Sequence, residues 1–313
     1  MNKTHIQWTN FTSNPLQYRD ADGNVVWGCI HKSTGCEHCY AEALAKRYGR
    51  GESFTAEHMK KMTPFLDEKE LHRMLTYKPA SGKMCFVGDM TDIFGEWVPF
   101  ELLDKLFAVF ALRPDVIWQI LTKRPERMRE YMTLLSKSIQ PLERHAREVG
   151  YTFAFNKISL LPWPIPNVWL GVSCEDQKTA DERIPKLLQT PAAVRFVSYE
   201  PALAPADFLK WLREPCRDTA THTCNNSIHR ESGARINWLI IGGESGPGAR
   251  PADRRWFYDA LKQCKEAGVP AFCKQLGTQS HIDNNGSFLP LKDRKGGDWS
   301  EWPEDLRVRE FPA

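Results

Sequence analysis

The sequence predicts an α/β fold, a partial TIM-like β/α barrel of about seven parallel strands. Short apolar segments typical of buried strands alternate with amphipathic stretches at helical spacing along most of the 313 residues. Each apolar segment ends in polar residues, and parallel strands of a barrel bring such ends to one mouth. An open, doubly wound sheet is the alternative, although it would gather fewer of these polar ends in one place.

The predicted strands are seven apolar segments, at residues 5–8, 84–87, 116–121, 168–172, 194–198, 236–241 and 269–273. Alanine and leucine content and three-to-four spacing predict helices between them. These helices cover residues 39–48, 67–75, 100–112 and 254–267, a stretch that begins at Pro125, and one that carries Ala180, Ile184 and Leu187.

The barrel is expected to span residues 1–277, with insertions at about 51–80, 137–166 and 214–235 that suit lids or partner surfaces. The last insertion holds Cys216, His222, Cys224 and His229, whose spacing matches no zinc module, so a polar surface loop is preferred to a second metal site. Residues 278–313 form a tail whose Trp299 and Trp302 predict that it packs back on the barrel.

Composition is that of an ordinary globular protein, with a net charge of +3 that is too small for a protein coating nucleic acid. The start of the chain lacks the apolar core of a signal peptide, and no apolar run is long enough to cross a bilayer. Nine cysteines, an odd number, suit a reducing compartment better than a disulfide framework. We therefore expect a cytoplasmic protein without membrane association.

Three cysteines lie within eleven residues ahead of one predicted helix, as Cys29-x6-Cys36-x2-Cys39. A Cys-x-x-Cys turn lets both sulfurs reach one metal centre, and the six-residue loop returns the third. An iron–sulfur cluster held by three cysteines leaves one iron free to bind a small molecule, whereas a structural zinc site normally closes with four protein ligands. Zinc completed by His31 or His38, and three unrelated buried thiols, are the alternatives.

Polar residues at the predicted strand ends could hold a zwitterionic cofactor, since acids meet amines and hydroxyls while bases meet carboxylates. The acids are Asp89, Asp92, Glu175, Asp176, Glu200 and Glu244, and the bases are Lys123, Arg124 and Lys274. For Asp92, Glu175 and Asp176, helix capping is the alternative, and for Lys123 and Arg124 it is a solvated face. Gly242 and Gly243 would let backbone approach a ligand closely.

Taken together, the chain resembles the radical S-adenosylmethionine superfamily and, more closely, an uncharacterised phage-associated three-cysteine-motif family. The matching segments are residues 28–29 (GC), 35–42 (GCEHCYAE), 121–128 (LTKRPERM), 169–173 (WLGVS), 198–201 (SYEP), 242–251 (GGESGPGARP) and 302–310 (WPEDLRVRE). The resemblance to the phage-associated family spans nearly the whole chain, and the superfamily resemblance rests mainly on the cysteines and the architecture.

The resemblance implies a barrel of the radical S-adenosylmethionine type and a 4Fe–4S cluster on Cys29, Cys36 and Cys39. S-adenosylmethionine would chelate the open iron through its amine and carboxylate, and its reductive cleavage would yield a 5'-deoxyadenosyl radical. A flavodoxin- or ferredoxin-like reductant is the implied partner. The phage association favours nucleic acid or a nucleotide as substrate.

Two departures from the superfamily stand out. Its usual spacing is Cys-x3-Cys-x2-Cys, and its Gly-Gly-Glu element follows the second strand, whereas here Gly242-Gly243-Glu244 comes much later. We therefore expect Asp89 to meet the cofactor amine. The other cofactor-binding candidates are Tyr40, Ser173, Glu175 and Glu200, and the substrate-binding candidates are Lys123, Arg124, Glu244 and Lys274.

The leading hypothesis is thus a radical S-adenosylmethionine-type iron–sulfur enzyme. The alternative is a non-catalytic, phage-associated binding protein whose zinc or iron–sulfur site only stabilises a loop.

Overall fold

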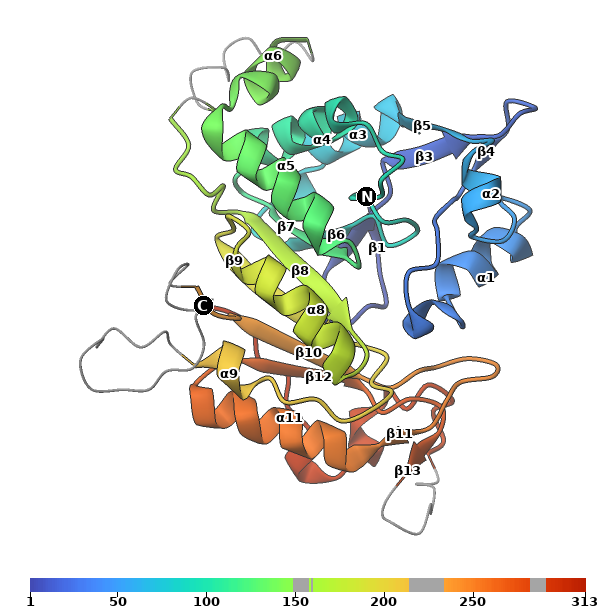
Figure 1. Cartoon of the computed structure of the whole chain (residues 1–313), viewed down its shortest axis with the longest axis vertical. Helices are drawn as coiled ribbons and strands as arrows, with labels where there is room; N and C mark the ends of the chain where they lie inside the picture. Colours follow the sequence, from blue (N-terminus) through green and yellow to red (C-terminus); the bar gives the residue numbers. More distant parts are fainter. Residues whose placement is uncertain (149–157, 159, 214–233, 282–290) are drawn as a thin grey trace. The chain divides into compact units, whose positions relative to one another are not determined.

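The computed structural model describes residues 1–148, 158, 160–213, 234–281 and 291–313 (Figure 1). These residues form two compact units. The first comprises Met1–Leu170 and Thr190–Ala193, and the second comprises Gly171–Gln189 and Val194–Ala313. Both contain parallel strands that alternate with helices, and the first also contains antiparallel strands, which confirms the predicted α/β class. The partial barrel is a more specific statement than the α/β class, and it stays a prediction.

The main sheet of the first unit has the strand order β1-β2-β6-β7. β1 (Asn2–Lys3) pairs antiparallel with β2 (Phe11–Ser13), while β2, β6 (Met84–Val87) and β7 (Ile117–Thr122) run parallel. Helices α4 (Phe100–Leu112) and α5 (Pro125–Lys137) follow β6 and β7, and α6 (Gln140–Glu148) contacts α4. This strand–helix alternation places the carboxyl ends of β6 and β7 side by side.

A smaller antiparallel sheet completes the first unit, in the order β4-β3-β5. Its strands are β3 (Leu16–Arg19), β4 (Val25–Val26) and β5 (Thr63–Leu66), and its neighbours in the chain are α1 (Tyr40–Arg47), α2 (Ala56–Met59) and α3 (Glu68–Thr76). The sequence prediction missed these strands, since short polar-containing segments such as LQYR lack an apolar run. The expected insertion at 51–80 therefore contains regular structure.

Aromatic side chains fill the core of the first unit, because both α4 and β7 are apolar on several sides. The rings of Phe107 and Phe110 lie 5.1 Å apart, and Phe110 lies 5.0 Å from Trp118 on β7. All three are fully buried, and burial of each such side chain contributes about 1.5–3 kcal/mol. This core supports the rigid strand ends that carry the candidate site.

The second unit contains the parallel strands β9 (Val194–Tyr199), β10 (Trp238–Gly242) and β12 (Ala271–Gln275), in that order. Its helices are α8 (Gln177–Leu188), α9 (Leu209–Leu212) and α11 (Arg254–Ala267), and β11 (Ala252–Asp253) pairs with β13 (Ser280–His281). β8 (Val168–Cys174) carries the chain from one unit into the next. Asp176 caps α8 in a capping box with Thr179, so the capping explanation is confirmed for this residue.

The C-terminal residues contribute to the core of the second unit. Trp302 is buried and donates from its indole to the carbonyl oxygen of Gly296. The ring of Phe311 packs edge to face with that of Phe272 on β12, with centroids 5.3 Å apart, and Trp238 donates to the carbonyl oxygen of Glu310. Trp299 is 43% exposed, so only one of the two tryptophans of this tail is buried.

One predicted strand is wrong. Residues 5–8 are not a strand, and they lie between β1 and β2. Trp8 is buried, because its ring lies 4.8 Å from that of Phe86, but its backbone belongs to a turn. The apolar character of this segment comes from Trp8, which is buried without being part of a strand.

Two expected insertions lie partly outside the described residues. Residues 149–157, 159 and 214–233 are among the undescribed ones, and they include Cys216, His222, Cys224 and His229. Within the described part of the chain, no helix is long and apolar enough to cross a membrane.

Candidate functional site

The three cysteines lie on one loop of the first unit, residues 28–39, which we name the thiol loop. A 3-10 turn over Thr34–Cys36 folds it back, and Cys39 is the N-cap residue of α1. The loop is anchored at its start, where Thr91 donates to the carbonyl oxygen of Gly28 at 2.7 Å. A side chain at Gly28 would meet Met59, since a Cβ there would lie 2.6 Å from its sulfur.

The sulfurs of the thiol loop are partly shielded from water. Cys29 and Cys39 pack against a cluster formed by Ala41, Ala45, Phe54 and Met90. Burial, together with the nearby carboxylate of Asp92, raises the pKa of the Cys29 thiol to about 12. Burial also raises the pKa of Cys39. Binding of a metal to these two sulfurs would therefore have to displace their protons.

The donors fit a three-cysteine cluster in number and chemistry, with a Cys-x-x-Cys turn leading directly into a helix. Across the described part of the chain, no three His, Cys, Asp or Glu side chains are placed to hold one metal ion, and this includes the thiol loop. In a 4Fe–4S cluster each cysteine binds a different iron, so this finding concerns a single ion and not a cluster.

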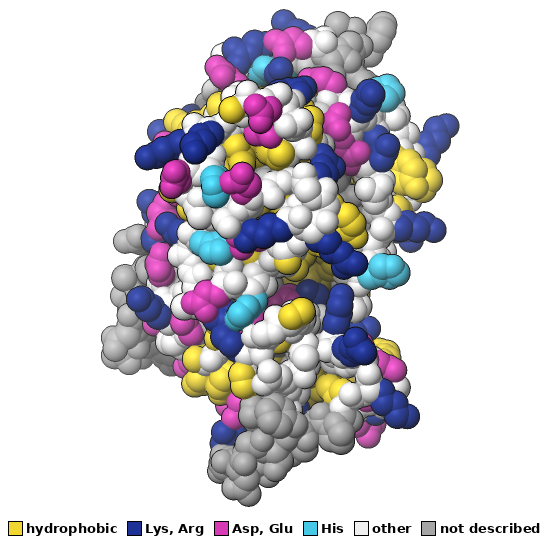
Figure 2. Space-filling view, turned by 90° about the vertical axis from the view of Figure 1, so that its right-hand side faces the viewer, with side chains coloured by type: hydrophobic (Ala, Val, Ile, Leu, Met, Phe, Trp, Pro, Cys, Tyr) yellow, Lys and Arg dark blue, Asp and Glu magenta, His cyan; other side chains and the backbone are white. Residues whose placement is uncertain are grey.

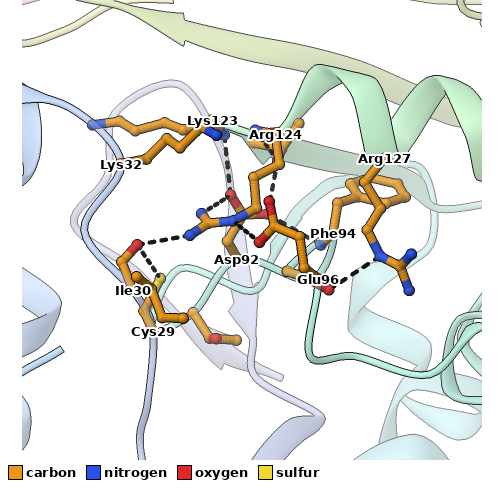
Figure 3. A network of polar contacts seen from close by, with 12 residues as sticks. Cys29, Ile30, Lys32, Asp92, Phe94, Glu96, Lys123, Arg124 and Arg127 are labelled. Carbon is orange, nitrogen blue, oxygen red and sulfur yellow. Dashed lines mark hydrogen bonds and ion pairs between the residues drawn. The ribbon is translucent and has the colours of Figure 1, made fainter. Parts of the chain in front are cut away.

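Arg124, at the carboxyl end of β7, holds the thiol loop in place (Figure 3). It is almost completely buried and donates from Nη2 to the carbonyl oxygen of Ile30 at 2.7 Å. Its other nitrogens donate to Asp92 at 3.1 Å and to Glu96 at 2.8 Å. The guanidinium also lies over the ring of Trp97, 4.6 Å from its centroid. These contacts make Arg124 a positioning residue.

Asp92, which follows β6, fixes the end of the neighbouring strand β7 by hydrogen bonds. Its carboxylate accepts hydrogen bonds from the hydroxyl of Thr122 at 2.7 Å and from the backbone amide of Lys123 at 3.0 Å. It also accepts from the amide of Phe94 at 3.1 Å. With Arg124 added, the Asp92 carboxylate accepts from four protein groups, although the N-cap residues of α4 and α5 are Pro99 and Arg124, so Asp92 is not the helix cap that the alternative predicted.

Lys123 points to the thiol loop. Its ammonium donates to the sulfur of Cys36 at 3.7 Å, and the backbone amide of Lys32 donates to the same sulfur at 3.5 Å. Lys123 and Arg124 are adjacent in sequence, and Figure 3 shows their side chains diverging. Both predicted cations of the first unit are thus brought to the three-cysteine segment.

Asp89, at the end of β6, joins the same region. Asn14 donates to its carboxylate at 2.6 Å, and Tyr40, the first residue of α1, donates from its hydroxyl to the Asp89 carbonyl oxygen at 2.5 Å. Burial raises the pKa of the Asp89 carboxyl. The ring of Tyr40 is 52% exposed, so it offers a surface beside the last cysteine.

In the second unit, Glu200 and Lys274 form an ion pair at the ends of β9 and β12, with side chains 17% and 19% exposed. Gly242 lies between them on β10, and a Cβ there would lie 3.2 Å from the Glu200 carboxylate. At Gly243 a Cβ would lie only 2.2 Å from the carbonyl oxygen of Leu276. The groups that lie close to these two glycines are therefore protein groups, where the sequence predicted a ligand.

Two other predicted residues of the second unit are engaged by arginines. Glu175 is fully buried, 3.2 Å from the Nη1 of Arg183, which also donates to the carbonyl oxygen of Ser173 at 2.7 Å. Glu244 accepts from the backbone amide and guanidinium of Arg250 at 2.7–2.9 Å. Each carboxylate already has charged partners, and ligand binding by either stays a prediction.

Several residues of the site could not be identified from the sequence. Asn14, Glu96 and Trp97 contact predicted residues but follow no motif. Asn14 lies 75 positions from Asp89 in sequence, so their contact depends on β2 and β6 being neighbours. An Asn directly before Pro15 predicts only a turn.

The charges on one face of the molecule are mixed. Figure 2 shows Lys and Arg side chains interspersed with Asp and Glu over this face. The net charge of +3 is therefore not displayed there as one large basic patch. Any contact of this face with nucleic acid would have to be local.

The fold and site define an α/β protein in which a thiol-bearing loop lies against the carboxyl ends of parallel strands. The chain belongs to the family described as "Protein of unknown function (DUF5131)", whose model matches residues 3–303. No curated protein and no solved structure matches it.

Proposed function

We propose that this chain is an iron–sulfur enzyme of the radical S-adenosylmethionine type, with Cys29, Cys36 and Cys39 as the cluster ligands. The observation that carries the proposal is the thiol loop itself. Three thiols precede a helix, and Lys123 and Arg124 contact the loop from the end of a parallel strand. A partial barrel, a phage association and a cytoplasmic location belong to the same proposal.

Charge favours a thiolate-held centre at this place. Iron–sulfur clusters on thiolates are anionic, and the N-terminus of α1 and the two cations all stabilise negative charge. When bound and reduced, such a cluster supplies the electron that cleaves S-adenosylmethionine. A flavodoxin- or ferredoxin-like protein is the proposed electron donor.

The protein's own residues would place the cofactor. The backbone carbonyl of Asp89 accepts from Tyr40, the first residue after the thiol loop, and the burial that raises the pKa of the Asp89 carboxyl also strengthens its attraction for an ammonium group. The exposed ring of Tyr40 suits a planar group such as a base, which agrees with a nucleic-acid or nucleotide substrate. Ser173, Glu175, Glu200, Glu244 and Lys274 keep their proposed roles toward cofactor or substrate.

A second candidate is a non-catalytic binding protein in which the thiol loop holds a structural metal. The same three thiols would be its ligands, with His31 or His38 completing a zinc site.

Anaerobic reconstitution with iron and sulfide tests the proposal. We expect uptake of four irons per chain, a brown colour, and release of 5'-deoxyadenosine from S-adenosylmethionine after reduction with dithionite, as for a 4Fe–4S cluster. Cys36→Ala should abolish both the colour and the cleavage. Cys85→Ala is the matched control, since Cys85 is buried in β6 away from the loop and should leave both unchanged.

A colourless protein that retains one zinc and leaves S-adenosylmethionine intact would support the binding protein instead. Full cleavage by Cys36→Ala would overturn the assignment of the ligands.

A further inference from the structure

We propose that Lys123 sets the reduction potential of the cluster, by placing its ammonium against the sulfur of Cys36. This inference rests on the cluster proposed above. The Nζ atom of Lys123 lies 3.7 Å from the Sγ atom of Cys36 and donates to it. Hydrogen bonds to the sulfurs and nearby charge are among the factors that determine the potential of an iron–sulfur centre.

The sulfur of Cys36 receives two donors from the surrounding protein. One is the Lys123 ammonium and the other is the backbone amide of Lys32, at 3.5 Å. A thiolate accepts both more strongly than a neutral thiol does. Because reduction adds negative charge, a cation at this sulfur favours the reduced state and raises the potential.

The position of Lys123 is fixed by the strand end. Its backbone amide donates to Asp92 at 3.0 Å, and the same carboxylate accepts from Thr122 and Arg124 on either side. This network fixes the backbone of Lys123, so the choice of side-chain rotamer alone determines whether the ammonium reaches Cys36. A group fixed in this way acts on a charge without a large reorganisation cost.

The two adjacent cations contact different parts of the thiol loop. Arg124 donates to the carbonyl oxygen of Ile30 and is paired with Asp92 and Glu96. Lys123 donates to the sulfur of Cys36, so its charge acts directly on a proposed ligand of the cluster.

The test compares midpoint potentials of reconstituted full-length protein, measured by redox titration with electron paramagnetic resonance detection. Lys123→Met should shift the potential to more negative values. Lys123→Arg should keep it near the wild-type value, because it preserves the charge. Lys123→Gln retains a neutral donor and should fall between them.

Lys32→Met is the matched control, since Lys32 reaches Cys36 through a backbone amide that the substitution keeps. Its potential should equal that of the wild type. The apoprotein gives a readout without a cluster. o-Phthalaldehyde joins a neighbouring amine and thiol in a fluorescent isoindole, which peptide mapping should locate between Lys123 and Cys36.

Equal potentials in the wild type, Lys123→Met and Lys123→Gln would overturn the inference and leave the cluster standing. Loss of iron from both variants would also overturn it, because Lys123 would then hold the site together rather than tune it. A wild-type protein that takes up no iron would overturn the proposed function and this inference with it.

Discussion

Arg124 donates to the carbonyl oxygen of Ile30 at 2.7 Å, and this bond ties the end of β7 to the thiol loop. The two residues are 94 positions apart in sequence. The same guanidinium is paired with Asp92 in a buried setting, where both side chains are less than a tenth exposed. The loop is therefore held by a charged group whose removal leaves a carboxylate without its counter-charge.

Arg124→Met should lower the free energy of unfolding by about 3–5 kcal/mol, because it strands Asp92 in a buried position. Urea denaturation followed by circular dichroism measures this. The control is Arg47→Met, at an exposed position of α1, which should cost less than about 0.5 kcal/mol. An Arg124 variant as stable as the control would show that the pair does not support the loop.

Asp89→Asn should make the protein more stable at neutral pH. Burial raises the pKa of Asp89 above its unfolded value, so its favourable contribution is present below the unfolded pKa and is lost as pH rises through the folded pKa. The neutral, equally sized asparagine removes that loss and still accepts from Asn14. Urea midpoints at acidic and neutral pH should show a gain that grows with pH.

Asp20→Asn is the comparison variant, and its effect on stability at neutral pH should have the opposite sign. Hydrogen bonds, first of all from Asn24, lower the pKa of Asp20, so its contribution is present above the unfolded pKa and is lost in acid. Its replacement should reduce stability at neutral pH. If Asp89→Asn also reduced it, Asp89 would be a structural carboxylate rather than one kept at a cost for ligand binding.

Glu175→Ala should lower the free energy of unfolding by about 3–5 kcal/mol, since it leaves the buried guanidinium of Arg183 without its carboxylate. A Glu175→Met, Arg183→Met double variant should recover much of that loss. Chemical denaturation of the wild type, the single variant and the double variant measures how much stability is recovered. If Glu175→Ala kept full stability but lost affinity for S-adenosylmethionine, the residue would serve the cofactor as the sequence suggested.

Gly243→Ala should destabilise the second unit by about 1–3 kcal/mol, because the added methyl group would overlap the backbone carbonyl of Leu276. Gly242→Ala is its neighbouring control. There the methyl group meets the side chain of Glu200 at 3.2 Å, which can move slightly. Thermal unfolding should therefore separate the two variants, and equal melting temperatures would contradict the close approach at Gly243.

Much of the fold follows from local pattern. The predicted strand segments from Met84 onward coincide with β6, β7, β8, β9, β10 and β12 to within a few residues, because continuous apolar runs bounded by polar residues leave few other structures. The small sheet of β3–β5 could not be predicted in this way. β3 and β5 are stabilised by pairing with each other across 40 or more intervening residues, as Leu16 with Leu66, rather than by their own composition.

By itself, the sequence determined the α/β class, the place of the thiol loop ahead of α1, and the polar residues that follow each strand. These depend on spacing and on local propensity, which neighbouring residues decide. The tertiary structure alone decided which polar groups are already paired: Asp92 and Arg124 with each other, Glu175 with Arg183, Glu244 with Arg250, and Lys123 with Cys36. Asp92 with Arg124 and Lys123 with Cys36 depend on tertiary contacts across 32 and 87 positions, whereas Glu175 with Arg183 and Glu244 with Arg250 depend on how the chain turns over eight and six positions. No local sequence pattern identifies either kind of pair.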